Sequence, residues 1–234
     1  MRYEGRWAAV GPRSQPVLAD TKFRRGSEER PLIASRAMMQ EHSGPGGKKI
    51  VVRKPGTVAV AYNGFTSNDA EASRAVAFVA DAYTLYLLGR FYFDRPGVVL
   101  ALNGEAIVDK AVCDQVLAVL RPGFGMAKED RVILFIDRAT NQLRLVRMTL
   151  SGLESTRGAE VDVTFRGFRN ICGIVWPMNF DERIRVPFDL DAHHWRMLGL
   201  DTNRGINASD LAVTEFKGPA ARLAPRPAAA LRAP

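Results

Sequence analysis

The chain has 234 residues, of which 47% are hydrophobic, and a formal net charge of +8. This composition excludes wholesale disorder, and a β-sandwich or barrel of this length is commonly one domain. No apolar run approaches the roughly 18 residues that a membrane-spanning helix needs. The N-terminal residues lack the apolar core of a signal peptide, so we expect either a cytoplasmic protein or a chain without its natural start. For the positive charge we favour a solvated polar sheet face over an acidic partner or a membrane surface.

The N-terminal segments predict strands joined by loops. Residues 2–10 form a strand candidate with Tyr3, Gly5, Trp7 and Ala9 on one face. Residues 11–16 hold two prolines and predict a loop, because proline cannot donate to a central ladder. The following candidates are weaker: strands over 17–24 and 30–36 on either side of the polar segment 26–29, and a strand end or short helix over 37–43.

The glycine-rich segment 44–49 ends in two lysines and invites comparison with a phosphate-binding loop. Such a loop requires a preceding strand, a following helix and a Ser or Thr after the lysine. Here the apolar run Ile50-Val51-Val52 follows instead, so we favour a hairpin turn. Residues 48–54 and 57–62 then predict a strand pair closed by an Asn63-Gly64 turn.

One long helix is predicted over residues 69–88, which contain no Gly or Pro and are followed by Gly89. Thr66 and Asp69 have the spacing of a capping box. An apolar stripe that includes Val76, Val79, Tyr83 and Tyr86 is wide enough to pack on a sheet face. Strands are expected again over 91–93, 98–103 and 112–120, with turns at 103–104 and 108–110.

Residues 129–187 predict an antiparallel meander with strands near 131–137, 143–150, 160–166 and 180–186. The third strand is the clearest, because Val161, Val163 and Phe165 alternate strictly with polar residues. We therefore expect these three side chains to face the interior.

A segment with carboxylates and histidines follows the meander: Asp189, Asp191, His193 and His194. Carboxylate and imidazole groups together suit zinc or another divalent ion, which leaves a metal-dependent hydrolase as a weak alternative. Adjacent histidines on an extended segment point to opposite faces, however, and no local active-site signature is present. We therefore expect no catalytic residue, no metal and no cofactor.

Three further observations limit the function classes. Cys113 and Cys172 are expected to be buried free thiols, with a single bridge as the alternative in an oxidising compartment. The basic residues are dispersed and no RNP-type or finger motif is visible, so a nucleic-acid partner is not expected. Residues 218–234 are rich in Ala, Pro and Arg and predict a disordered tail after a single domain over 1–217.

The meander resembles the LolA/LolB-like family of outer-membrane lipoprotein-sorting proteins. The resemblance lies in a strand that ends in Ile136-Asp137, a turn with Thr140, a strand with Val161 and Phe165, and the segment Gly167–Pro177. It covers residues 48–186. It implies an incomplete, strongly curved antiparallel β-barrel that wraps around helices, with an apolar cavity that holds acyl chains. It also implies a location in the periplasm or cell envelope.

These observations predict a mainly β (α+β) fold, with one curved antiparallel sheet around one main helix. The favoured function is a monomeric, non-enzymatic carrier or binding protein for an acyl chain, a lipoprotein or another apolar ligand. The alternative is a structural or interaction protein with a closed core. Large apolar side chains on inward or doubly buried faces are the candidates for the cavity lining: Trp7, Phe78, Tyr83, Tyr86, Phe91, Phe135 and Phe165.

Overall fold

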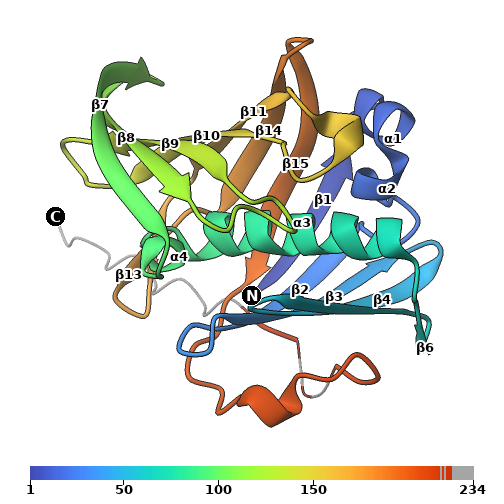
Figure 1. The fold of residues 1–234 in the computed structure, drawn as a ribbon. Coiled ribbons are helices and arrows are strands. Elements are labelled where there is room, and N and C mark those ends of the chain that lie inside the picture. The colour runs from blue at the N-terminus through green and yellow to red at the C-terminus, as the bar shows by residue number, and fades with distance from the viewer. Residues whose placement is uncertain (217, 219, 223–234) are drawn as a thin grey trace, which may run out of the picture.

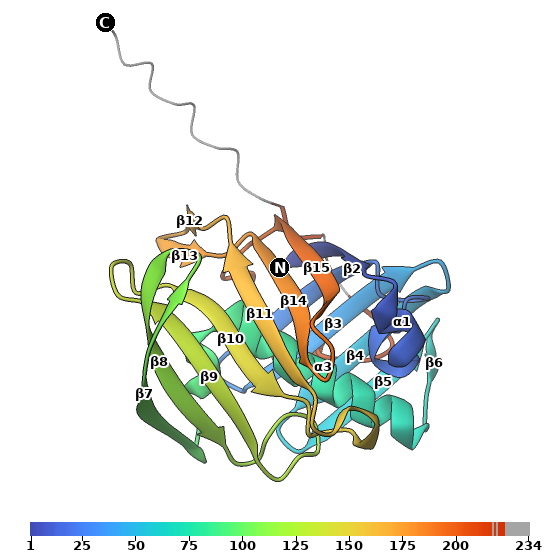
Figure 2. The ribbon, with the colours of Figure 1, turned by 90° about the horizontal axis from the view of Figure 1, so that it is seen from above.

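The strands, several of which alternate apolar and polar residues, form one 13-stranded antiparallel sheet. This sheet curves strongly around a central helix without closing on itself (Figures 1 and 2). The computed structural model describes residues 1–216, 218 and 220–222. It confirms the predicted fold class, a mainly β protein with a curved sheet around one main helix. Within the described part of the chain, no helix has the length and apolar character to cross a membrane.

The strands of the main sheet follow the order β6-β5-β4-β3-β2-β1-β15-β14-β11-β10-β9-β8-β7, and β12 and β13 form a separate hairpin. The bounds are β1 Arg2–Trp7, β2 Gly26–Leu32, β3 Ala37–Gly44, β4 Gly47–Lys54, β5 Thr57–Tyr62, β6 Phe65–Thr66, β7 Val98–Val108, β8 Ala111–Leu120, β9 Asp130–Asp137, β10 Leu143–Thr149, β11 Glu160–Arg166, β12 Arg169–Ile171, β13 Ile174–Trp176, β14 Asn179–Val186 and β15 Leu190–Gly199.

The helices are α1 Val10–Ser14, α2 Pro16–Ala19, α3 Ala70–Leu88 and α4 Arg90–Phe93, with 3-10 turns at Glu154–Thr156 and Ala208–Asp210. The predictions of a loop over 11–16 and of strands over 17–24 and 91–93 are therefore wrong. Pro12 and Pro16 lie in the first turns of α1 and α2, where a missing backbone N–H costs little. At 91–93, Tyr92 packs inward on Phe124 while the chain continues in a helical turn after α3.

Two further predictions need correction. The strand predicted over 30–36 instead runs over Gly26–Leu32 as β2, and residues 33–36 form a turn. The strand therefore includes the polar segment 26–29, whose Ser27 and Glu29 are buried. Asn103-Gly104 does not end a strand either: β7 continues to Val108, and the two residues form a bulge between Leu102 and Glu105. The ambiguous segment 37–43 is strand β3.

The predicted long helix is confirmed as α3, which lies along the concave face of the sheet (Figure 1). Asp69 is its N-cap, since its carboxylate accepts hydrogen bonds from the backbone N–H groups of Glu71 and Ala72 at 2.8 and 3.1 Å. The capping box predicted from Thr66 and Asp69 is therefore wrong in its cap residue: Asp69 itself is the N-cap. Gly89 ends the helix with φ of 53°.

The strand β11 has the predicted register. Val161, Val163 and Phe165 are buried at 1%, 0% and 2% exposure, and all three belong to the core beneath α3. The centre of the sheet lies outside the meander, however. There β1 pairs with β15 on one side and with β2 on the other, so that strands from the two ends of the chain are neighbours.

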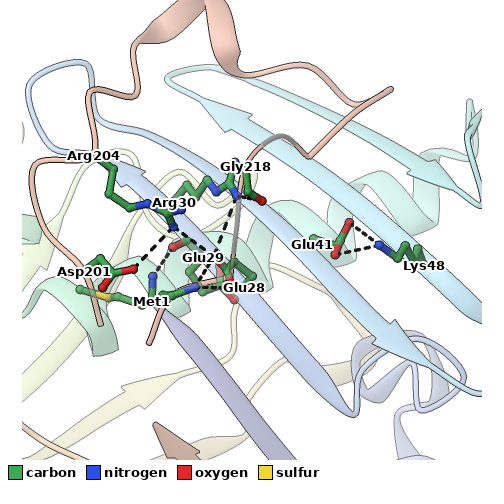
Figure 3. Close-up of polar contacts among 10 residues, drawn as sticks. Met1, Glu28, Glu29, Arg30, Glu41, Lys48, Asp201, Arg204 and Gly218 are labelled. Atoms are coloured by element: carbon green, nitrogen blue, oxygen red, sulfur yellow. Dashed lines mark hydrogen bonds and ion pairs between the residues drawn. The ribbon is translucent and has the colours of Figure 1, made fainter. Parts of the chain in front are cut away.

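The outer face of β2–β4 is covered by the segment that follows β15. Leu211 packs against Met39 and Ile50, which point away from α3. Polar contacts accompany this packing (Figure 3): Arg204 lies 3.6 Å from the carboxylate of Glu28, and Arg30 lies 3.9 Å from it. This half of the sheet therefore has an apolar layer on both faces.

Two sequence predictions concern single residues and the tail. Cys113 and Cys172 are both free, but only Cys113 is buried, because Cys172 lies in the exposed turn between β12 and β13. Most of the predicted disordered tail lies outside the described residues. Within the described part, Ala221 is buried and its backbone N–H donates to the carboxylate of Glu28 at 3.1 Å.

Candidate functional site

A cavity of about 70 Å³ lies between α3 and the concave face of β11, β14 and β15. Gly11, Gln15 and Leu18, from α1, α2 and their junction, border it on one side. Figures 1 and 2 show these two short helices beside α3. The walls are mostly apolar, with the side chains of Val79, Ala82, Leu150, Val161 and Ile184 among them.

Four predicted site residues meet at this cavity. Phe78, Tyr83 and Tyr86 line it from α3. Tyr86 lies three residues after Tyr83 and eight after Phe78, and both spacings keep the side chains within a quarter turn of Tyr86 on the helix. Trp7 reaches it from the end of β1, where its ring stacks on that of His193 at a centroid distance of 3.7 Å. Helix and sheet thus both contribute aromatic side chains.

The other three predicted residues lie elsewhere. Phe165 is buried behind Tyr86, with ring centroids 6.3 Å apart, and does not line the cavity. Phe91 lies on α4 and borders a separate cavity of about 170 Å³ near the C-terminal end of α3. Phe135 is on the convex face of β9, where the Arg147 guanidinium covers its ring at 5.3 Å. The seven predicted residues therefore do not line a single cavity.

Arg24 forms the polar end of the first cavity and is only 2% exposed. Its Nη1 donates to the backbone oxygen of Leu18 at 2.5 Å, and its Nη2 donates to the hydroxyl of Tyr83 at 2.7 Å. The guanidinium carbon lies 5.1 Å from the ring centroids of both Trp7 and Tyr83. Aromatic faces thus stabilise this buried cation.

His193 lies beside this group and is fully buried. The indole Nε1 of Trp195 can only donate, so Nδ1 of His193 accepts its hydrogen bond, at 2.5 Å. Burial lowers the pKa of His193 well below its usual value, and the charge of Arg24 lowers it further. The imidazole is therefore neutral, and its buried Nε2 has no hydrogen-bond partner in the described structure.

Glu182 lies next to His193 on the neighbouring strand, with the carboxylate 3.6 Å from Nδ1 of His193. Burial raises the pKa of Glu182 to about 7, against an opposing effect of Arg24. Glu182 and Arg24 are not among the site residues that the sequence predicts. The alternation of β14 indicates that Glu182 faces inward, because it falls between Phe180 and Ile184 on the same face. Arg24 lies in an irregular segment, where no periodicity predicts the direction of its side chain.

The histidine segment does not form a metal site in the structure. His193 faces the interior, whereas His194 lies on the outer face with Nδ1 2.8 Å from Asp181. Asp189 and Asp191 both pair with Arg183, at 2.6 and 2.7 Å. Among the residues that the structure describes, no group of three or more His, Cys, Asp or Glu side chains could hold a metal ion.

No family model matches this sequence, and none of the curated proteins matches it. Solved structures with a similar fold include two crystal structures. A DUF1329 family protein from Desulfovibrio piger has a TM-score of 0.55 at 12% identity, covering 80% of each chain. A LolA superfamily protein from Nitrosomonas europaea has a TM-score of 0.55 at 12% identity, covering 83% of this chain and 81% of the other. Together with the curved sheet around α3, this likeness identifies the protein as having the LolA-type fold.

Proposed function

We propose that the protein binds an apolar chain, such as the acyl chain of a lipid or lipoprotein, in the cavity between α3 and the sheet. The observation that supports this most directly is the lining itself. Phe78 and Tyr86 from the helix face Val161 and Ile184 from the sheet across free space. Burial of each methylene there contributes about 0.8 kcal/mol to binding, and no chemical step is required.

The size of the cavity determines how such a ligand enters. At about 70 Å³ it is well below the roughly 300–1,000 Å³ of pockets that hold drug-sized ligands. A long chain therefore requires the border of the cavity to move. The segment of α1 and α2 is the part that moves in this proposal, because short helices of five and four residues have few internal hydrogen bonds.

Hydrogen bonds between Gln15 and Ser155 hold this segment closed. Gln15 Nε2 donates to the backbone oxygen of Ser155 at 2.9 Å, and Ser155 Oγ donates to Gln15 Oε1 at 3.0 Å. Ser155 is exposed, Gln15 is half-buried, and both bonds lie where solvent reaches them. Breaking them therefore exchanges them for bonds to water at little net cost. Separating α2 from the 150–156 loop would then enlarge the cavity toward solvent.

The binding proposal is tested with the neutral dye N-phenyl-1-naphthylamine, whose fluorescence rises in apolar sites. Saturable binding that is displaced by 1-dodecanol is expected for the wild type. Ile184→Trp fills the cavity and should abolish binding without loss of fold. Val186→Trp is the matched control, since Val186 lies two residues along the same strand, is 40% exposed and does not line the cavity.

The second candidate function, a structural or interaction protein with a closed core, is favoured by the small volume of the cavity. It predicts no saturable binding of the dye. It also predicts that Ile184→Trp destabilises the fold by about 1–3 kcal/mol through overpacking. That pair of results would contradict the carrier proposal.

We extend the proposal to the cell envelope and to a monomeric carrier that meets a membrane surface or a lipoprotein. This extension rests on the resemblance to lipoprotein-sorting proteins and on the fold. Fractionation of the native host cells tests the location. Light scattering of the purified protein tests the monomer.

A further inference from the structure

We propose that the cavity selects amphiphiles with an anionic head group, a long-chain carboxylate above all, and that Arg24 binds the head group. This inference rests on the proposed function and specifies its ligand. It concerns the polar end of the cavity, where Arg24 and Glu182 lie at the end of an otherwise apolar lining.

Arg24 is a buried cation without an ion-pair partner. No carboxylate among the described residues lies within 4.0 Å of its guanidinium, although the same structure pairs the partly buried Arg53 and Arg147 with Asp81 and Asp162. A buried charge is costly unless a counter-charge and hydrogen bonds compensate it. The carboxylate of a ligand supplies both.

The hydrogen bonds of Arg24 leave a donor for such a ligand. Nη1 and Nη2 are engaged by Leu18 and Tyr83, but Nε is buried and has no hydrogen-bond partner. The rings of Trp7, Tyr83 and Trp195 fix the guanidinium in place, with its central carbon 5.1–5.9 Å from their centroids. A fixed donor binds an oxygen anion with little loss of side-chain entropy.

Glu182 is compatible with a bound anion, because its carboxyl can be protonated and neutral. Burial raises the pKa of this carboxyl to about 7, so near neutral pH the site readily takes up a proton. The groups that face it are Arg24 from the segment before β2, neutral His193 from β15, and Tyr83 and Tyr86 from α3. An incoming carboxylate competes for Arg24 and favours protonation of Glu182, which then donates a hydrogen bond.

The charge balance favours a monoanion. One guanidinium and one neutral carboxyl compensate a single negative charge, whereas a phosphate dianion would leave one charge buried without a partner. The alkyl chain then extends from Arg24 along Val79, Leu150 and Val161. A free fatty acid has this combination of head and tail.

The experiment measures displacement of N-phenyl-1-naphthylamine from the full chain at pH 7 by three ligands of one chain length: dodecanoate, 1-dodecanol and dodecyltrimethylammonium. Wild type should bind dodecanoate about 10- to 100-fold more tightly than the alcohol, as expected for hydrogen bonds to a charged group. Arg24→Met should remove this preference while retaining alcohol binding. Arg25→Met is the matched control, because Arg25 is exposed and lies outside the cavity.

A second measurement uses only folded wild type, in case Arg24→Met does not fold. Calorimetry in buffers of different ionisation enthalpy should show proton uptake when dodecanoate binds at pH 7 and none when dodecanol binds. Glu182→Gln should abolish the uptake. Equal affinity for acid and alcohol in the wild type, or preference for the ammonium, would overturn the head-group inference and leave the carrier intact. Failure of all three ligands and of the dye would instead reject the carrier.

Discussion

Arg53 on β4 and Asp81 on α3 join the sheet to the helix by two hydrogen bonds, Nε to Oδ1 at 2.9 Å and Nη2 to Oδ2 at 2.8 Å. Asp81 also accepts a hydrogen bond from the backbone N–H of Gly125 at 2.7 Å. One nearly buried carboxylate thus links the helix, the sheet and the loop before β9. Removing one partner of such a pair leaves an uncompensated buried charge.

We therefore expect Asp81→Asn to lower the free energy of unfolding by about 3–5 kcal/mol. Urea denaturation of the purified variant measures this change. Asp94→Asn, at an exposed position after α4, should alter stability by no more than about 0.5 kcal/mol. Equal, small effects of both substitutions would show that the link to Arg53 contributes little.

Phe165 and Thr164 test the register of β11. Phe165→Ala should cost about 3–5 kcal/mol, because the ring is 2% exposed and contacts Tyr86 and Phe180. Thr164 lies on the opposite face, paired with Asp181 and Leu145. Its replacement by Ala should change stability little. Thermal and urea unfolding distinguish the two variants.

The contact between Gln15 and Ser155 predicts a kinetic effect. Gln15→Ala should increase both the association and the dissociation rate of the dye several-fold, because it removes both hydrogen bonds that hold α2 to the 150–156 loop. Stopped-flow fluorescence measures both rates. Gln115→Ala removes a similar exposed hydrogen bond, to the backbone oxygen of Glu105, and should leave the exchange rates unchanged.

The pH dependence of stability is predicted from Glu29. Burial raises its pKa from 4.5 to about 7, so between these values the folded state holds a proton that the unfolded state has lost. Rising pH then favours unfolding. Relative to Glu29→Gln, the wild type should lose stability as pH increases from about 4.5 to about 7. A stability of the wild type, relative to Glu29→Gln, that stays constant or increases over this pH range would contradict the raised pKa of the buried Glu29 carboxyl.

His42 and His193 change the pH dependence of stability in the opposite direction to Glu29. Burial lowers both pKa values below 6.5, so the unfolded state takes up protons first and stability falls as pH decreases below the unfolded value. The comparison with Glu29→Gln cancels this contribution, because both histidines are present in both proteins. Unfolding at a series of pH values between 4 and 8 yields the difference.

Metal analysis tests the histidine segment. Because His193 and His194 face opposite sides of the sheet, we expect no stoichiometric zinc in protein purified without chelators. About one zinc per chain, lost in His193→Ala, would restore the hydrolase alternative. His194→Ala serves as the control for general effects of histidine removal.

The sequence predicts best where one face is apolar and the other polar. The strand β11 and the helix α3 satisfy that condition, and the sequence pattern predicts both elements and their inward residues. β2 does not satisfy it, because the polar side chains of Ser27 and Glu29 are buried and the pattern there looks like a polar segment outside a strand. Phe135 shows the reverse problem: an apolar side chain on the convex face is covered by the guanidinium of Arg147, which no pattern within its own strand reveals.

The candidate site was predictable only in its apolar part. The aromatic residues of α3 belong to a helical stripe, so their common direction follows from spacing alone. Arg24 comes from an irregular segment, and its position depends on where Leu18, Trp7 and Tyr83 meet in three dimensions. Long-range contacts of this kind leave no local signal.

The pairing of β1 with β15 at the centre of the sheet has a consequence for biosynthesis. Gly5 lies opposite Trp195, almost the whole length of the chain away. During synthesis, β1 has no β15 to pair with until residues 190–199 have been made. The ring contact between Tyr83 and Trp195 cannot form before then either. Folds dominated by such distant pairings form slowly and expose apolar surface meanwhile. We therefore expect the nascent chain to depend on a holding chaperone until β15 emerges from the ribosome.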